Sequence, residues 1–200
     1  MKSNITVLKY GGSSISSFEK IQKIAAYLKE RVDHDEQLVI VVSAMGKMTD
    51  ELLKNVAQIT NNPNQEDLAM LLTTGEQQSI AYLSMALKEL NVKSKSLTGY
   101  QAGIQTVGHH LKSKIASISS KRFLDLFKLN DIIIVAGFQG FNEFGELTTL
   151  GRGGSDTTAA AIASILKCPC EIYTDVDGIY STDPRVYSNV KKIDKISAAE

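Results

Sequence analysis

The sequence predicts an α/β fold: a three-layer αβα sandwich around a mainly parallel central sheet. Two observations support this class. Short apolar runs alternate along the chain with longer segments of helical periodicity, as in folds whose parallel strands are joined by helices. Residues 38–42 are also almost wholly apolar, which is typical of a strand covered on both faces. The 200 residues, 43% of them hydrophobic, can form one large domain, and no linker-like segment divides them.

The chain opens with a strand, a glycine turn and a helix. Residues 5–10 are expected to form a strand, and Gly11-Gly12 supplies the turn that ends it. Ser16 and Glu19 have the spacing of a capping box, so we expect the first helix to begin there.

Two helices follow the apolar strand at residues 38–42. The first is short, begins near residue 50 and is expected to be capped by Thr49. The second spans residues 66–90 and carries leucines and one isoleucine on a single stripe, which Gly75-Glu76 interrupts with a flexible residue and a charge.

The second half of the chain continues the alternation. Phe144-Gly145 is expected to turn a hairpin after the strand at residues 132–135, and Ser155 is expected to cap a helix over residues 156–166. Further strands are expected at residues 92–97, 132–135 and 170–174.

A glycine-rich turn at residues 151–156 is the most informative segment. Glycines at 151, 153 and 154 leave room for a ligand to approach the backbone, and the free N–H groups of the following helix point toward the turn. Arg152 adds a planar fork that can grip a carboxylate through two hydrogen bonds. These features predict a phosphate or carboxylate site.

Four polar side chains follow or end predicted strands. Lys9, Ser43 and Asp175 come at strand ends, and Arg152 follows the hairpin. Because open parallel sheets bind ligands at the carboxyl ends of their strands, we expect these groups to meet at one edge.

Composition and spacing exclude several other functions. Lys+Arg and Asp+Glu are both 22, so there is no net charge to attract nucleic acid, and no apolar stretch is long enough to span a membrane. Residues 9–14 lack P-loop spacing, no dinucleotide-binding glycine pattern follows a strand, and residues 175–178 lack the later ligands of a calcium loop.

No protein metal site is expected from the cysteines and histidines. Cys168 and Cys170 have no second ligand pair, and His34, His109 and His110 are interpreted as surface residues. With no signal peptide apparent, we expect a cytoplasmic protein.

Several segments together resemble aspartate kinases, and they run in that family's order from residue 5 to about 185. A set this long is more specific than any single motif. The segments are residues 9–14, 42–46, 49–50, 74–76, 103–106, 137–159 and 171–185.

The resemblance implies an amino acid kinase fold and ATP-dependent phosphorylation of the side-chain carboxylate of L-aspartate, the first step of lysine, threonine and methionine synthesis. It implies that Lys9 stabilises the phosphoryl group and that Asp156 orients Lys9. The phosphate loop would be Gly11, Gly12 and Ser13, and the remaining ATP contacts Thr174, Asp175, Tyr180 and Arg185. Aspartate would be held by Ser43, Glu76, Arg152, Gly154 and Ser155. Magnesium would bridge the phosphates with few direct protein ligands.

The residue chemistry agrees with these implied roles. Arg152 suits the α-carboxylate of aspartate and Glu76 its ammonium, which leaves the β-carboxylate free to attack. Donor and acceptor are both anionic, so Lys9 is needed between them. An apolar helix face within residues 66–90 would suit a homo-oligomer.

Two alternatives stay open. Another kinase of the same fold, such as glutamate 5-kinase, would share residues 175–185 but not the combination of residues 9–14 and 151–156. A non-catalytic fragment that binds aspartate is the other. Resembling enzymes continue beyond the last strand here with a further phosphate-binding lysine and regulatory ACT domains, so we expect residues 1–200 to be a C-terminally incomplete catalytic domain.

Overall fold

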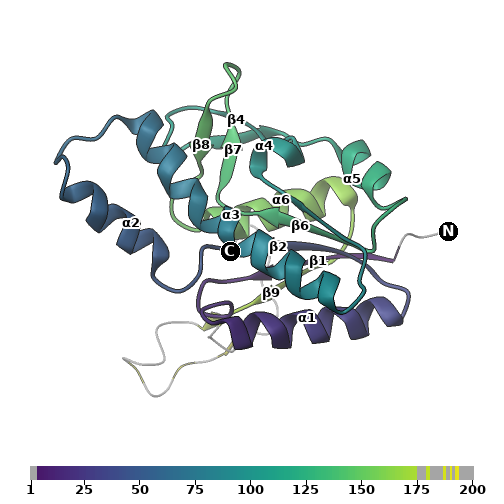
Figure 1. The fold of residues 1–200 in the computed structure, drawn as a ribbon. Helices are drawn as coiled ribbons and strands as arrows, with labels where there is room; N and C mark the ends of the chain where they lie inside the picture. The colour runs from purple at the N-terminus through teal and green to yellow at the C-terminus, as the bar shows by residue number, and fades with distance from the viewer. Residues whose placement is uncertain (1–3, 175–178, 181–186, 188–189, 191, 194–200) are drawn as a thin grey trace.

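The structure is a computed structural model that describes residues 4–174, 179–180, 187, 190 and 192–193. Its elements alternate between strand and helix through most of the chain (Figure 1). The helices are α1 (Phe18–Asp33), α2 (Met48–Ala57), α3 (Gln65–Glu89), α4 (Gly99–Ala102), α5 (Ser120–Leu126) and α6 (Gly154–Leu166). The strands are β1 (Ile5–Tyr10), β2 (Gln37–Val42), β3 (Ser94–Leu97), β4 (Gln105–Val107), β5 (Lys114–Ser117), β6 (Ile132–Ala136), β7 (Gln139–Phe141), β8 (Leu147–Thr149), β9 (Cys170–Tyr173), β10 (Ile179–Tyr180) and β11 (Lys192–Ile193).

The central sheet has the order β3-β6-β2-β1-β9, and all its neighbouring strands are parallel. Every residue of β1 and β6 is buried, as are all of β2 except Gln37. The predicted α/β fold with a mainly parallel sheet is therefore confirmed. It follows from the apolar runs because only a sheet covered on both faces can bury both sides of each strand.

Alternation along the strands divides the core into two layers. Leu8, Ile40 and Ile134 pack against α1 and α3, whereas their neighbours Val7 and Val41 pack against the layer that contains α5 and α6. In Figure 1, α1 and α3 accordingly lie on one side of the sheet, and α6 lies on the other. Lys9 is two residues from Val7, so its side chain points to the α6 side.

A smaller sheet has the order β5-β4-β7-β8 and stands beside the central sheet, above the N-terminal half of α3 in Figure 1. Strands β7 and β8 are antiparallel and are joined by the predicted hairpin, in which Gly145 adopts φ +81°. This arrangement sets the hairpin and the following glycine turn close to the end of β2, since α6 packs against both β1 and β2.

Several helix starts differ from the expectations. Ser17, not Ser16, caps α1 by accepting a hydrogen bond from Lys20 N, and α2 begins at Met48 without a side-chain cap. Among the described residues no helix is long and apolar enough to span a bilayer.

Candidate active site

Lys9 is the penultimate residue of β1 and is only 8% exposed. Its Nζ lies 2.8 Å from Oδ1 of Asp156, which stands in the first turn of α6. Asp156 is half exposed, so the pair links a buried ammonium to a carboxylate at the mouth of a cavity. An ammonium held this way has two further donors for an anionic ligand.

The glycine turn after β1 approaches neighbouring backbone closely. A Cβ at Gly12 would lie 2.6 Å from the carbonyl oxygen of Ala44, and the Gly12 carbonyl accepts a 3.0 Å hydrogen bond from Gly46 N. Gly11 N donates to the carbonyl of Tyr173 at 3.3 Å, which ties the turn to the end of β9. The predicted turn therefore needs glycine at position 12 for space.

In the glycine turn at residues 151–156, α6 begins at Gly154, two residues earlier than expected. Gly151 and Gly153 adopt φ +75° and +73°, in the left-handed region that favours glycine. Gly153 is the N-cap, and the predicted cap Ser155 instead lies buried inside the first turn. Its place is explained by close packing, because a Cβ at Gly137 would lie 2.8 Å from Ser155 Oγ. The free N–H groups of α6 still point toward the turn.

Glu76 reaches the same region from the middle of α3. It is 3% exposed, and its Oε1 accepts a 3.0 Å hydrogen bond from Ala44 N. Its Oε2 has no hydrogen-bond partner within the described part of the chain. Burial raises the pKa of the Glu76 carboxyl to about 7, and the hydrogen bond from Ala44 opposes that rise only in part. Gly75 permits the approach, since a Cβ there would lie 2.7 Å from Ala44 Cβ.

These groups surround one cavity of about 380 Å³. It is lined by eight of the residues that the sequence singles out: Lys9, Gly12, Ser43, Glu76, Arg152, Gly154, Ser155 and Asp156. Arg152 is exposed at the rim and makes no hydrogen bond or ion pair with the described residues, so its guanidinium is available to a ligand.

The remaining predicted site residues either do not line the cavity or lie outside what the structure describes. Gly11, Ser13 and Thr174 do not line this cavity, although Gly11 is adjacent to it through Gly12. The structure describes the backbone of Tyr180 in β10 but not its side chain, and Asp175 and Arg185 lie outside the described residues.

Gly151 and Gly153 of the predicted glycine turn also line the cavity. Four other lining residues had not been singled out as ligand contacts: Ala44, Gly46, Thr49 and Phe138. Phe138 has a backbone φ of +67°, which is rare for a bulky residue and is a feature of functional sites. Nothing in its local sequence signals this strain. Thr49 was expected only to cap a helix.

The arrangement suits a small zwitterionic acid. An exposed guanidinium and helix N–H groups offer places for carboxylates, and the buried Glu76 offers a partner for an ammonium. Lys9 supplies a second cation at the end of the sheet. Opposite charges partly shielded from solvent attract more strongly than they do in water.

Comparison with known proteins agrees with this description. The model of the amino acid kinase family matches residues 4–200. The chain is 51% identical over 197 residues to an aspartokinase of Geobacillus stearothermophilus and 47% identical to aspartokinase 2 of Bacillus subtilis. These alignments cover 98% of this chain and 48% of each relative, so the chain spans about half the length of the curated relatives it matches.

Solved structures give the same result. An aspartate kinase from Synechocystis superposes with a TM-score of 0.79 at 43% identity, over 94% of this chain and 31% of that chain. E. coli aspartokinase III in complex with aspartate and ADP superposes with a TM-score of 0.80 at 25% identity, over 95% of this chain and 53% of that chain. Isopentenyl phosphate kinase, at 19% identity and a TM-score of 0.67, shares the fold over 95% of this chain and 81% of its own. The chain belongs to the amino acid kinase family.

Proposed function

We propose that this chain carries the acceptor site of an aspartate kinase, which transfers the γ-phosphoryl group of ATP to the side-chain carboxylate of L-aspartate and forms 4-phospho-L-aspartate. The observation that carries the proposal is the meeting of Lys9, Glu76 and Arg152 around one cavity. Its relatives named aspartokinase, at 51% and 47% identity, support the same reaction.

The acceptor is held by charge complementarity. Arg152 grips the α-carboxylate through two parallel hydrogen bonds, and Ser43, Gly154 and Ser155 line the cavity beside it. Glu76 takes the ammonium on its unpaired Oε2. Binding of that ammonium favours the ionised carboxyl, so it lowers the pKa that burial has raised. The β-carboxylate is left directed at Lys9.

Lys9 acts on the transfer itself. Aspartate and ATP repel each other, and the transition state spreads negative charge over the phosphoryl oxygens. An ammonium already fixed 2.8 Å from Asp156 Oδ1 stabilises that charge without further reorganisation. Asp156 is thus a positioning residue, which holds the Lys9 side chain in its place.

The nucleotide side of the site is proposed from the neighbouring turn. Gly11, Gly12 and Ser13 bring backbone N–H groups toward the phosphates, and Gly11 is tied to Tyr173 ahead of Thr174. Asp175, Tyr180 and Arg185 remain the proposed ATP contacts. Mg²⁺ bound to the nucleotide would neutralise phosphate charge. Glu76 is the only buried carboxylate in the described cavity lining, which fits an ion held mainly by the phosphates.

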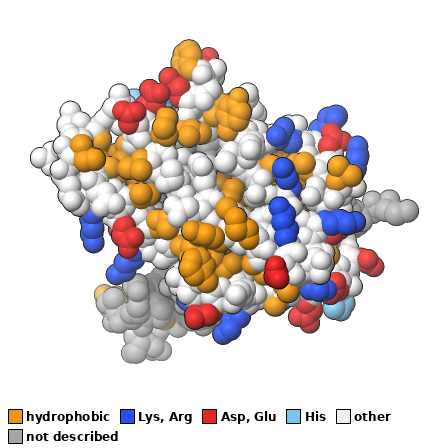
Figure 2. Space-filling view, viewed as in Figure 1, with side chains coloured by type: hydrophobic (Ala, Val, Ile, Leu, Met, Phe, Trp, Pro, Cys, Tyr) orange, Lys and Arg blue, Asp and Glu red, His pale blue; other side chains and the backbone are white. Residues whose placement is uncertain are grey.

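The assembly and location follow from the same proposal. Residues 1–200 form the N-terminal part of the kinase catalytic domain, and an enzyme that uses ATP and free aspartate works in the cytoplasm. Figure 2 displays hydrophobic side chains on the face covered by α1 and α3, where Phe18 and Met85 are 61% and 65% exposed. This patch supports a homo-oligomer, which light scattering on the purified chain tests.

The test of function is coupled ADP release with Mg-ATP and three acceptors: L-aspartate, L-glutamate and N-acetylglutamate. We expect ADP release with aspartate alone, together with aspartate binding in calorimetry. Release with glutamate would move the assignment to a glutamate kinase. Aspartate binding without ADP release would identify a ligand-binding chain, and absence of both would refute the proposal.

A further inference from the structure

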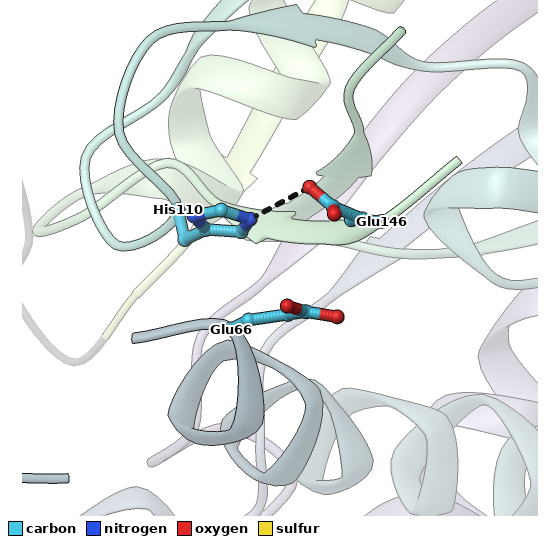
Figure 3. Close-up of side chains that lie close together, drawn as sticks. All are labelled: Glu66, His110 and Glu146. Atoms are coloured by element: carbon cyan, nitrogen blue, oxygen red, sulfur yellow. Dashed lines mark hydrogen bonds and ion pairs between the residues drawn. The ribbon is translucent and has the colours of Figure 1, made fainter. Parts of the chain in front are cut away.

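A second group of ligand-type side chains lies outside the active-site cavity. Glu66, His110 and Glu146 come from the first turn of α3, the β4–β5 loop and the β7–β8 hairpin, and one ligand atom of each lies within 4.8 Å of the others. Figure 3 shows Glu66 facing the His110–Glu146 pair across the gap between α3 and the small sheet. No local motif revealed this group, because its members are 36 or more residues apart.

Two of the three side chains are already fixed. His110 Nε2 lies 3.0 Å from Glu146 Oε2, and Asn142 Nδ2 donates to the same oxygen at 2.6 Å. Asn142 Oδ1 in turn accepts a hydrogen bond from Glu146 N at 3.0 Å. The Asn142 side-chain amide therefore binds both the backbone and the side chain of Glu146. These contacts hold the Glu146 carboxylate in one orientation beside His110. A carboxylate oriented by an amide that is not itself a ligand resembles the outer shell of metal sites.

Glu66 is the member without a partner. Its side chain makes no hydrogen bond or ion pair with the residues that the structure describes, whereas its backbone N–H is capped by Asn64 Oδ1 at 2.8 Å. The helix start is therefore satisfied without the Glu66 carboxylate, which is solvent-accessible and free to turn. Two carboxylates facing each other would repel unless a cation or a donor lay between them.

From this geometry we propose that Glu66, His110 and Glu146 bind a divalent transition metal ion of the Zn²⁺ class. One imidazole nitrogen and two carboxylate oxygens make a three-ligand set with a fourth position for water. Imidazole selects Zn²⁺ and its first-row neighbours over Mg²⁺. Ligands about 2.1 Å from such an ion are about 3.4 Å apart in a tetrahedron, so a separation of at most 4.8 Å closes through a small rotation of Glu66.

The ion would join three segments that also support the acceptor site. The carbonyl of His110 accepts a hydrogen bond from Thr149 N at 2.6 Å, and Thr149 is two residues before Gly151. Ser113 N donates to the carbonyl of Thr149 at 2.9 Å, which holds the same strand end. A metal at this site would thus hold the base of the Gly151–Asp156 turn. The site itself is independent of the proposed kinase reaction, because metal binding is measured without substrates.

Calorimetric titration of ZnCl₂ into the purified chain, without nucleotide, tests the proposal. We expect one ion per chain, with Kd raised at least tenfold in Glu66→Gln and in His110→Ala. Glu66→Gln is the decisive variant, since its side chain supports no other described contact. His109→Ala is the matched control, because this exposed neighbour is not in the cluster and should bind Zn²⁺ as the parent does.

The exposed thiol of Cys170 is the competing source of Zn²⁺ binding, and Cys170→Ser measures its part. Unchanged affinity in Cys170→Ser supports the site at Glu66, His110 and Glu146. The proposal is overturned if the parent chain binds no Zn²⁺, if Glu66→Gln and His110→Ala bind it as tightly as the parent, or if binding disappears with Cys170.

Discussion

Glu76 gives a prediction about the pH dependence of stability, because burial disfavours the charged form of its carboxyl group. Its pKa is raised by desolvation from the ordinary 4.5 to about 7, so between these values the folded chain binds a proton that the unfolded chain has lost. The free energy of unfolding therefore falls as pH rises through this window, by about 3 kcal/mol in total. Glu76→Gln keeps the acceptor for Ala44 N and removes the charge. We expect the unfolding free energy of this variant not to decrease through this pH window, so the variant should be more stable than the parent at pH 8.

Urea denaturation of both proteins at several pH values between 4.5 and 8 measures the effect. The quantity to compare is the difference in unfolding free energy between parent and variant, because the other carboxyl groups are common to both. Glu143→Gln, a change at an exposed glutamate in the hairpin, is the control and should leave the pH dependence unchanged. A difference that stays constant with pH would refute the reasoning. The same variant should raise the KM for aspartate by about tenfold or more, since it loses the charged partner of the ammonium.

Three further predictions concern packing and buried pairs. Gly12→Ala puts a Cβ 2.6 Å from the Ala44 carbonyl oxygen, so we expect a loss of about 1–3 kcal/mol in chemical denaturation and a fall in ADP release; parent-like values of both would contradict the close approach. Arg31→Ala removes hydrogen bonds of 2.6 Å to Glu36, just before β2, and of 3.1 Å to Glu171 in β9. We expect denaturation to show a loss of about 2 kcal/mol, and an unchanged stability would contradict a stabilising role for these bonds. Thr148→Val leaves the buried hydroxyl of Thr106 without its 2.6 Å partner, so thermal unfolding should show a loss of about 1–2 kcal/mol, and an unchanged melting temperature would count against the pair.

The parts of the fold that the sequence predicts are those whose pattern is long or wholly apolar. Strands β1, β2 and β6 are buried on both faces, so most of their residues are apolar. The 25-residue α3 repeats its apolar stripe often enough to be recognised. The short and partly exposed β4 and β5 carry no such pattern, and α4 and α5 are too brief for helical periodicity. These short elements depend on contacts with distant parts of the chain, which a local sequence pattern does not show.

The candidate site divides in the same way. Lys9 stands beside one glycine turn and Arg152 within another, and both residues line one cavity. Glu76 was expected to break an apolar stripe, yet it is buried, because α3 passes close enough to Ala44 for Gly75 to be needed. Ser155 was assigned as a cap by residue type alone, although Gly153 provides the left-handed backbone that the turn requires. Such distinctions depend on how distant segments pack.

The separation of roles between Lys9 and Arg152 is the central claim, and steady-state kinetics of two variants tests it most directly. We expect Lys9→Ala to lower kcat by about 10² or more with little change in the KM for aspartate, because it removes charge stabilisation made mainly in the transition state. Arg152→Ala should chiefly raise that KM. Near-normal kcat in the Lys9 variant, or an unchanged KM in the Arg152 variant, would contradict the account.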